Sequence, residues 1–391
     1  MGGSTGQFAG IDERDYRSTM PDEHPPETDD MVVVKTSRSP EELADRLGVW
    51  LAEVTGDPAA TVKNASSPDA NGMSSESVFF NASFNGESGL FVARLAPADE
   101  DVPVFPEYDL EKQARVIELI ANRSDVPVPT VRWNEPDPRH LDVPFFVMEK
   151  IDGRVPPDIL PYPMDGWVRD LTDTERRALQ NKSVAVLAGI HSIDISDGSA
   201  DFLQPDATLG ATPLERHFSQ EKAFYEWVVD GAGRRFPTIE RAHAWIEANW
   251  PDEQPSAISW GDSRIGNIMY TNDGTDPVAV LDWEMATIAP PGHDVAWMCF
   301  LHRFFEFVLR KYGVDTLPEM LRPEDVRETY GELTGTDVGD LRFELVYTAA
   351  RHAAIMARVH ARSVHFGTEE WTDDPDDAFR FKDLLAEMLA N

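Results

Sequence analysis

The chain has 391 residues, a formal net charge of −35 and a hydrophobic content of 41%. This hydrophobic content supports a sizeable core and argues against a disordered chain. The negative charge argues against nucleic acid or anionic lipid as partners, because both require basic protein surfaces. An acidic surface would either attract cationic small molecules or simply keep the protein in solution.

The single cysteine, Cys299, lies in an apolar stretch, which excludes an intrachain disulfide and a cysteine-based zinc site. No apolar run is long enough to span a membrane, and the N-terminus lacks the apolar segment of a signal peptide. We therefore expect a cytoplasmic protein without a membrane partner.

The first part of the chain changes character at about residue 30. Residues 1–30 are rich in Gly, Asp, Glu and Pro, which predicts a disordered acidic segment. Ser39 is then followed by Pro40 and two glutamates, which predicts a helix that begins at Pro40 and ends at about Val54.

Strand periodicity begins near Thr61 and returns after a loop of small residues. Apolar side chains alternate from Val78 to Phe84, a turn is expected at 85–89, and a second strand runs from Leu90 to Leu95. Further along, apolar spacing predicts a helix at 110–122 and strands at 128–133 and 145–148.

The charged residues and the glycine of 149–153 mark a connector. We therefore divide the chain into a β-rich N-lobe at 31–150 and a helical C-lobe at 151–391. The second part contains two strand signals and a series of helices, predicted at 172–192, 212–227, 239–250, 294–312, 323–333 and 340–362, with strands at 268–270 and 278–281. This order predicts an α+β fold with two lobes.

The residues with the clearest chemistry lie just before the first of these two strands and just after the second. Asp262 and Asn267 share a short polar loop between apolar flanks, where both could face one phosphate or simply form a turn. Asp282 ends the apolar run 278–281, and a carboxylate there is costly unless it is paired, caps a turn or binds a metal. A carboxylate, an amide and a second carboxylate in this order suit metal-dependent phosphoryl transfer.

The pattern G-D-x-x-x-x-N followed by D-W-E resembles the catalytic and metal-binding loops of the aminoglycoside phosphotransferase and choline kinase-like family. The resemblance covers roughly residues 60 to 365 and is closest to the bacterial branch related to the kinase-like domain of acyl-CoA dehydrogenase fusions. It implies a protein-kinase-like fold, ATP as the donor, Asp262 as the catalytic base, and Asn267 and Asp282 as Mg²⁺ ligands.

The same resemblance implies a nucleotide site in the N-lobe. The hinge would contact adenine at Met148, Glu149 and Ile151, and the small-residue loop would cover the phosphates with Ser74 and Ser75.

Three residues stand where the family usually has others. Arg94 takes the place of the strand lysine, where it either grips phosphate or faces solvent as an ordinary strand residue. Gln113 takes the place of the partner glutamate and cannot form an ion pair. Trp260 takes the place of a histidine and is expected to support the loop by packing.

Two nearby residues have two interpretations each. Arg264, two residues after Asp262, would neutralise charge on the transferring phosphoryl group or lie on the surface. Asp294 would anchor the catalytic loop or cap the helix that follows.

The predicted function is ATP- and Mg²⁺-dependent phosphorylation of a hydroxyl group on a small molecule. The acceptor would be aminoglycoside-like or a hydroxylated acyl or acyl-CoA metabolite. An acyl-CoA acceptor would require a basic patch, and Arg351, Arg358 and Arg362 form either that patch or a solvated stripe on one helix face.

Two other functions are suggested by single features of the sequence. A nucleotide-binding protein without transferase activity is motivated by Arg94 and Gln113. An esterase is suggested superficially by Gly261-Asp262-Ser263, but this block lies late in the chain and no Asp-x-x-His follows it near the end.

Overall fold

The computed structural model describes residues 38–67, 75–98, 101–252 and 255–390. The predicted disordered segment 1–30 and Ser74 of the small-residue loop lie outside these residues. The division between lobes at residue 150 stays a prediction.

One antiparallel sheet of five strands dominates the N-terminal part, in the order β1-β2-β3-β5-β4. Its strands are β1 (Thr61–Ser66), β2 (Glu76–Phe84), β3 (Glu87–Leu95), β4 (Val131–Glu135) and β5 (Phe145–Glu149). β4 begins three residues later than predicted, because Pro129 cannot donate a hydrogen bond to the ladder.

The turn between β2 and β3 is shorter than predicted. Phe84 pairs with Glu87, so the turn contains only Asn85 and Gly86, with φ of 48° and 80°. Asn-Gly favours this left-handed backbone in a two-residue hairpin, and the residues at 87–89 therefore belong to the strand.

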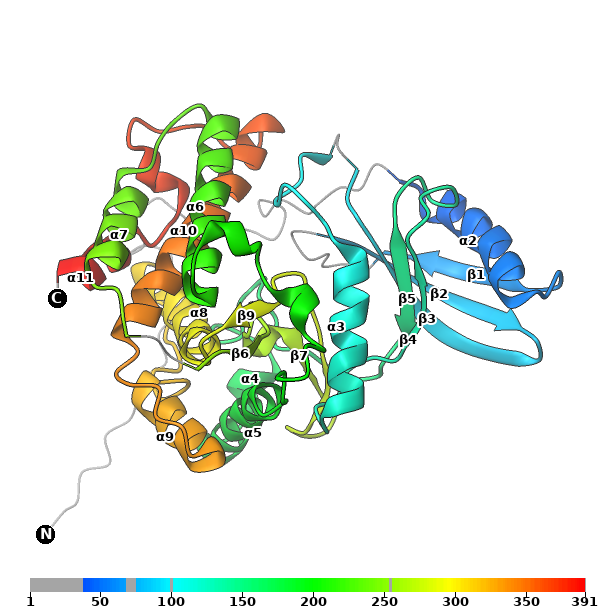
Figure 1. Ribbon diagram of the computed structural model, residues 1–391, viewed down its shortest axis with the longest axis horizontal. Helices are drawn as coiled ribbons and strands as arrows, with labels where there is room; N and C mark the ends of the chain where they lie inside the picture. Colours follow the sequence, from blue (N-terminus) through cyan, green and yellow to red (C-terminus); the bar gives the residue numbers. More distant parts are fainter. Residues whose placement is uncertain (1–37, 68–74, 99–100, 253–254, 391) are drawn as a thin grey trace, which may run out of the picture.

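Two helices flank the sheet (Figure 1). Helix α2 (Pro40–Thr55) begins as predicted, with the Ser39 hydroxyl accepting a hydrogen bond from the Glu42 amide. It buries Trp50 edge-on against Phe145, with ring centroids 5.0 Å apart. Helix α3 (Leu110–Arg123) packs against β4 and β5 and lies between the sheet and the helical part.

The C-terminal part is mainly helical. Its α-helices in chain order are α4 (Trp167–Asp170), α5 (Asp173–His191), α6 (Pro213–Ala232), α7 (Pro237–Ala248), α8 (Gly292–Lys311), α9 (Pro323–Thr334), α10 (Arg342–His365) and α11 (Lys382–Ala390). In the described part of the chain, no helix has the length and apolar character needed to cross a membrane.

Two short ladders are enclosed by these helices. β7 (Ile268–Tyr270) pairs with β8 (Pro277–Val280), close to the predicted strands. β6 (Ala257–Ser259) and β9 (Thr287–Ala289) pair with each other and were not predicted, because three-residue strands show no periodicity that sequence could reveal.

Candidate active site

The β6–β9 ladder holds the two loops that contain the predicted catalytic and metal-binding residues. Ser259 pairs with Thr287, so the catalytic loop leaves the ladder at the point where the metal-binding loop returns to it. The β7–β8 hairpin connects the loops, and the Leu281 amide donates to the Asn267 carbonyl at 2.9 Å. This topology brings Asp262, Asn267 and Asp282 to one place.

The Asp262 carboxylate is held by hydrogen bonds at both oxygens. Oδ1 accepts from the Trp297 indole at 2.7 Å. Oδ2 accepts from Asn267 Nδ2 at 2.8 Å and from Arg264 Nε at 3.1 Å. The carboxylate therefore has a fixed orientation while remaining partly exposed.

The Asn267 side chain has a defined orientation as well. Its Nδ2 also donates to the Asp262 carbonyl at 3.0 Å, so both amide hydrogens are directed at Asp262. The amide oxygen is thus left as an acceptor, and the residue is buried. An oriented amide oxygen beside carboxylates suits a hard cation.

Asp282 occupies a strained backbone position next to a cation. Its φ is 60°, which is uncommon for a residue other than glycine. One carboxylate oxygen lies 3.4 Å from an Arg94 terminal nitrogen. Burial raises the pKa of Asp282, Arg94 opposes the shift, and the neighbouring Asp262 adds to it.

Arg94 faces this site rather than solvent. Its guanidinium donates to Ser77 at 2.9 Å and to Ser75, in addition to its contact with Asp282. The interpretation of Arg94 as a solvent-facing strand residue is therefore wrong. Gln113 is buried on α3, and no hydrogen bond joins it to Arg94 in the described residues.

The predicted adenine contacts lie at the end of the sheet. Met148 and Glu149 end β5, where they pair with Val92 and Phe91 of β3, and Ile151 follows directly. The Glu149 carboxylate accepts from Arg132 at 2.9 Å.

Sequence reasoning missed Asp158, which lies in the loop before α4. Arg264 bridges two carboxylates, because its Nη1 contacts Asp158 while its Nε contacts Asp262. A Cβ at Gly266 would lie 2.8 Å from Asp158 Oδ1 and 2.9 Å from Arg264 Nη1, so a side chain there would displace the two groups of this bridge. Arg264 is part of the site and not a free surface residue, and no local motif marked its partner.

Asp294 anchors the catalytic loop. Its buried carboxylate accepts from the Trp260 amide at 2.7 Å, the Gly261 amide at 2.9 Å and the Ser259 hydroxyl at 2.9 Å. His191 Nε2 lies 3.0 Å from the same carboxylate. Of the two interpretations of Asp294, an anchor for the loop or a helix cap, the structure shows the anchor.

Gly261 lets the anchored loop lie against the metal-binding loop. Its φ is 91°, and a Cβ at this position would lie 2.3 Å from the Met285 carbonyl oxygen. Any side chain would therefore separate the two loops.

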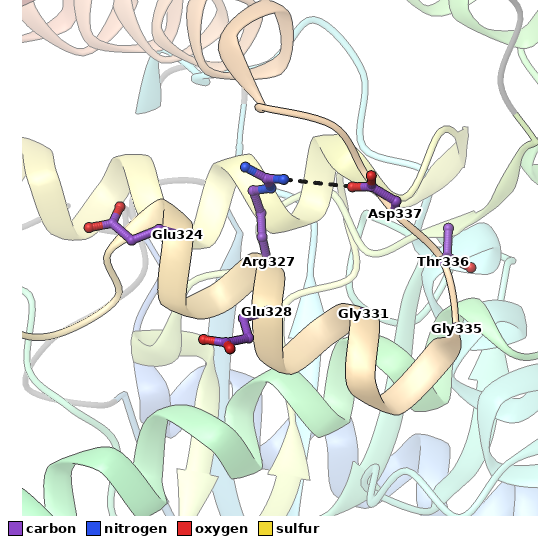
Figure 2. A pocket seen from close by; sticks show the side chains of 7 residues that line it. All are labelled: Glu324, Arg327, Glu328, Gly331, Gly335, Thr336 and Asp337. Atoms are coloured by element: carbon purple, nitrogen blue, oxygen red, sulfur yellow. Dashed lines mark ion pairs between the residues drawn. The ribbon is translucent and has the colours of Figure 1, made fainter.

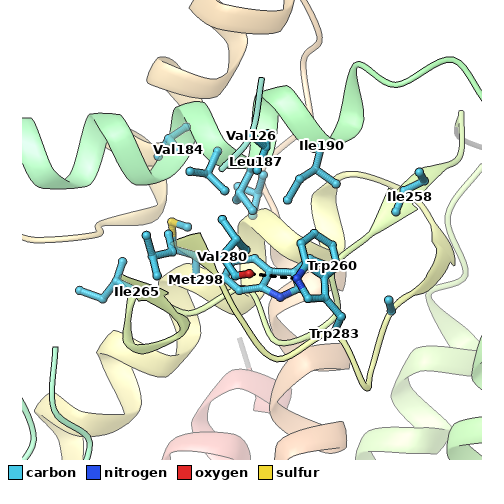
Figure 3. Close-up of a cluster of buried hydrophobic side chains, with 14 of the residues drawn as sticks. Val126, Val184, Leu187, Ile190, Ile258, Trp260, Ile265, Val280, Trp283 and Met298 are labelled. Atoms are coloured by element: carbon cyan, nitrogen blue, oxygen red, sulfur yellow. Dashed lines mark hydrogen bonds between the residues drawn. The ribbon is translucent and has the colours of Figure 1, made fainter. Parts of the chain in front are cut away.

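Trp260 supports the site by packing and by hydrogen bonding. It is fully buried next to Trp283 in the core cluster that Figure 3 shows, with ring centroids 5.8 Å apart. Its indole N–H donates to the Leu281 and Asp282 carbonyls at 2.9 and 3.0 Å. A bulky indole donor thus joins the catalytic loop to the backbone of the metal-binding loop.

Replacement of Trp260 by phenylalanine should therefore lower the free energy of unfolding by about 1–3 kcal/mol, because two carbonyls lose their donor in a buried place. Urea unfolding measures the effect. Trp245→Phe is a matched control, since Trp245 is only partly buried on α7. Equal losses in both variants would contradict this role of the indole N–H.

The surface also contains a hollow, and Figure 2 shows the side chains that line it. It is lined by α9 and the turn that follows, where Arg327 pairs with Asp337 at 3.7 Å. None of the predicted site residues lines it.

A protein-family model described as the phosphotransferase enzyme family matches residues 67–325. This range contains both loops, Arg94 and the hinge.

Curated relatives are long proteins. The chain is 26% identical over 283 residues to acyl-CoA dehydrogenase family member 10 of Mus musculus, covering 70% of this chain and 24% of that protein. It is 27% identical over 208 residues to acyl-CoA dehydrogenase family member 11 of Homo sapiens, covering 53% and 24%. The chain thus spans about a quarter of the length of these relatives.

Solved structures share the fold. A protein of Ralstonia eutropha, named provisionally as an aminoglycoside phosphotransferase, gives a TM-score of 0.62 at 21% identity, covering 88% of this chain and 96% of that one. Aminoglycoside 2′-phosphotransferase-IIIa, solved with GDP, gives a TM-score of 0.51 at 14% identity, with 89% and 99% covered. At these low sequence identities, the similarity shows a shared fold and nothing further.

Proposed function

The chain belongs to the phosphotransferase enzyme family, and on this basis we propose that it transfers the γ-phosphoryl group of ATP to a hydroxyl group of a small molecule. The predicted family and the predicted kinase-like α+β fold are confirmed. The observation that carries the proposal is the fixed carboxylate of Asp262 beside Asn267 and Asp282.

Asp262 is the proposed base. An acceptor hydroxyl beside this carboxylate would be oriented for attack on the γ-phosphorus, with its proton passing to Asp262 as the bond to the leaving ADP oxygen breaks. The hydrogen bonds from Trp297 and Asn267 keep the carboxylate in one orientation, so little reorganisation precedes the reaction.

Asn267 and Asp282 fit a magnesium ion. Both present oxygen atoms, and the Asn267 amide oxygen is left without a role in the hydrogen bonds that orient the side chain. Mg²⁺ is commonly held by one or two protein oxygens together with substrate phosphates. When bound, the ion would neutralise charge on the β- and γ-phosphates.

The remaining contacts would hold the nucleotide. We propose that Arg94, with Ser75 and the neighbouring Ser74, binds phosphate oxygens, because a guanidinium is charged and offers several donors. Met148, Glu149 and Ile151 would contact adenine. Gln113 is proposed to belong to the same site from α3.

The acceptor is proposed to be a hydroxylated small molecule, either aminoglycoside-like or an acyl or acyl-CoA metabolite. We also propose that the protein is cytoplasmic and binds neither nucleic acid nor membranes.

A panel that measures ADP release tests the function, with aminoglycosides, amino alcohols and hydroxyacyl-CoA compounds as acceptors. Turnover that depends on both Mg²⁺ and an acceptor is the expected result. Tight ATP binding with no turnover on any hydroxyl compound would instead favour a nucleotide-binding protein without activity. That second candidate is supported by the Arg94–Asp282 contact and by the neutral Gln113.

Arg264 is proposed to stabilise charge on the transferring group. Arg264→Ala should lower kcat about 100-fold while the KM for ATP changes little, because the interaction would strengthen mainly in the transition state. Steady-state kinetics measure this split. Arg303→Ala, an exposed arginine on α8, is the matched control. An unchanged kcat in Arg264→Ala would exclude this role.

A further inference from the structure

Two arginines on α10 are buried in an unusual way. Arg358 and Arg362 are 8% and 5% exposed, which makes them the most buried lysines or arginines among the residues that the structure describes. They are four residues apart and therefore lie on one helix face. Neither the basic patch nor the solvated stripe predicted from sequence describes them well, because water is largely excluded.

Neither arginine has a carboxylate partner at ion-pair distance within the described ranges. Arg358 donates through Nε and Nη2 to the Pro103 carbonyl, at 2.9 and 2.7 Å, and its guanidinium lies 4.3 Å from the Trp227 ring. Arg362 Nε has no hydrogen-bond partner. Arg362 therefore has one buried donor, Nε, that no group in the described part of the chain uses.

The surroundings contain two acidic groups, Asp101 and the Tyr108 hydroxyl, but neither forms an ion pair with the two arginines. Burial lowers the pKa of each arginine, and the like charge of Arg362 lowers that of Arg358 further. Asp101 acts in the opposite direction on Arg362, from beyond ion-pair distance. Two largely buried like charges without an ion-pair partner are costly, and a bound anion would offset that cost.

We propose that Arg358 and Arg362 form an anion-binding subsite that receives a carboxylate or phosphate group of the acceptor. This inference rests on the proposed function and specifies its substrate class. Arginine suits the task because its planar donors match the oxygen pairs of both anions.

The same helix connects the subsite to the predicted base. Arg351, two turns earlier, pairs with Glu221 at 2.9 Å, and its guanidinium lies 5.3 Å from the Trp297 ring. Trp297 in turn donates to Asp262. At a rise of about 1.5 Å per residue, Arg358 and Arg362 lie about 10 and 16 Å further along the helix axis than Arg351.

The acceptor is therefore an extended molecule with a hydroxyl at one end and an anionic group at the other. Lys112 of α3 is close enough to Arg351 for their charges to interact, while Asp109 and Glu284 act on Lys112 in the opposite direction.

Thermal unfolding with simple anions tests the subsite. The nucleotide site is first saturated with a non-hydrolysable ATP analogue and Mg²⁺, and inorganic phosphate or acetate is then titrated. Phosphate at about ten times its Kd should raise the Tm of the wild type by about 2 °C. A rise with acetate as well would identify a carboxylate site, whereas a rise with phosphate alone would identify a phosphate site.

Arg362→Met separates a binding role from a structural one. We expect it to lose the anion-dependent rise in Tm while its Tm without anions equals or exceeds that of the wild type, because an unpaired buried charge is removed. Arg241→Met, at an exposed arginine of α7, should behave like the wild type.

The proposal is overturned if neither anion raises the Tm of the wild type. It is also overturned if Arg362→Met has a lower Tm than the wild type but keeps the same rise in Tm with anions. Failure of the proposed function is distinguishable, because it would abolish stabilisation by the ATP analogue, and binding of that analogue does not involve Arg362.

Discussion

Asp262→Asn is expected to lower kcat by about 10³-fold or more with little effect on ATP affinity. The amide cannot accept the proton of the attacking hydroxyl, while its similar shape preserves most of the contacts with Trp297 and Asn267. ADP release measures turnover, and titration with a non-hydrolysable ATP analogue measures binding.

Asp273→Asn is the matched control, since Asp273 is exposed in the turn of the neighbouring β7–β8 hairpin. Retention of full turnover by Asp262→Asn would exclude Asp262 as the base. Loss of turnover together with loss of ATP-analogue binding would show instead that the substitution disrupts the site.

Asp294→Ala is expected to lower the free energy of unfolding by about 3–5 kcal/mol and to abolish turnover. The substitution removes one buried carboxylate on which the Ser259 hydroxyl, two backbone amides and His191 converge. The amides of Trp260 and Gly261 would be left buried without acceptors, and the catalytic loop would lose its anchor. Chemical denaturation measures the loss, with Asp273→Ala as the control.

The pH dependence of stability should change in the same variant. Burial alone would raise the pKa of Asp294, but hydrogen bonds from His191 and from the Gly261 and Trp260 amides outweigh it, and the pKa is lowered. Because the unfolded state then binds more protons, this group stabilises the fold above its unfolded pKa, and the contribution is lost as pH falls through the folded pKa. Asp294→Ala should therefore show a shallower loss of stability in acid, and an unchanged slope would contradict the assignment.

Trp260 and Asp294 together support the loop in which the family resemblance leads one to expect a histidine at position 260. Asp294 fixes the backbone at the start of the catalytic loop, and the Trp260 indole fixes that loop to the carbonyls before and at Asp282. These contacts fix the position of the two loops relative to each other without a histidine at position 260.

Local sequence was sufficient to predict much of the fold and of the candidate site. The spacing of Asp262, Asn267 and Asp282 indicated the family because these residues lie on two short loops. Residues on one short loop are neighbours in sequence as well as in space, so their pattern can be read from the sequence. Helix boundaries such as Pro40 were predictable because capping depends on neighbouring residues, as Ser39 shows.

Only the tertiary structure decided which distant residues complete the site. The Arg264–Asp158 bridge and the Arg94–Asp282 contact join segments 106 and 188 residues apart, and neither has a local pattern. The β6–β9 ladder is too short to show periodicity. The same holds for Arg358 and Arg362, whose spacing on α10 is visible in sequence but whose burial is not. Arg358, for example, is covered by Trp227 and by the backbone at Pro103. Sequence records spacing along the chain, whereas burial and pairing depend on which surfaces meet when the chain folds.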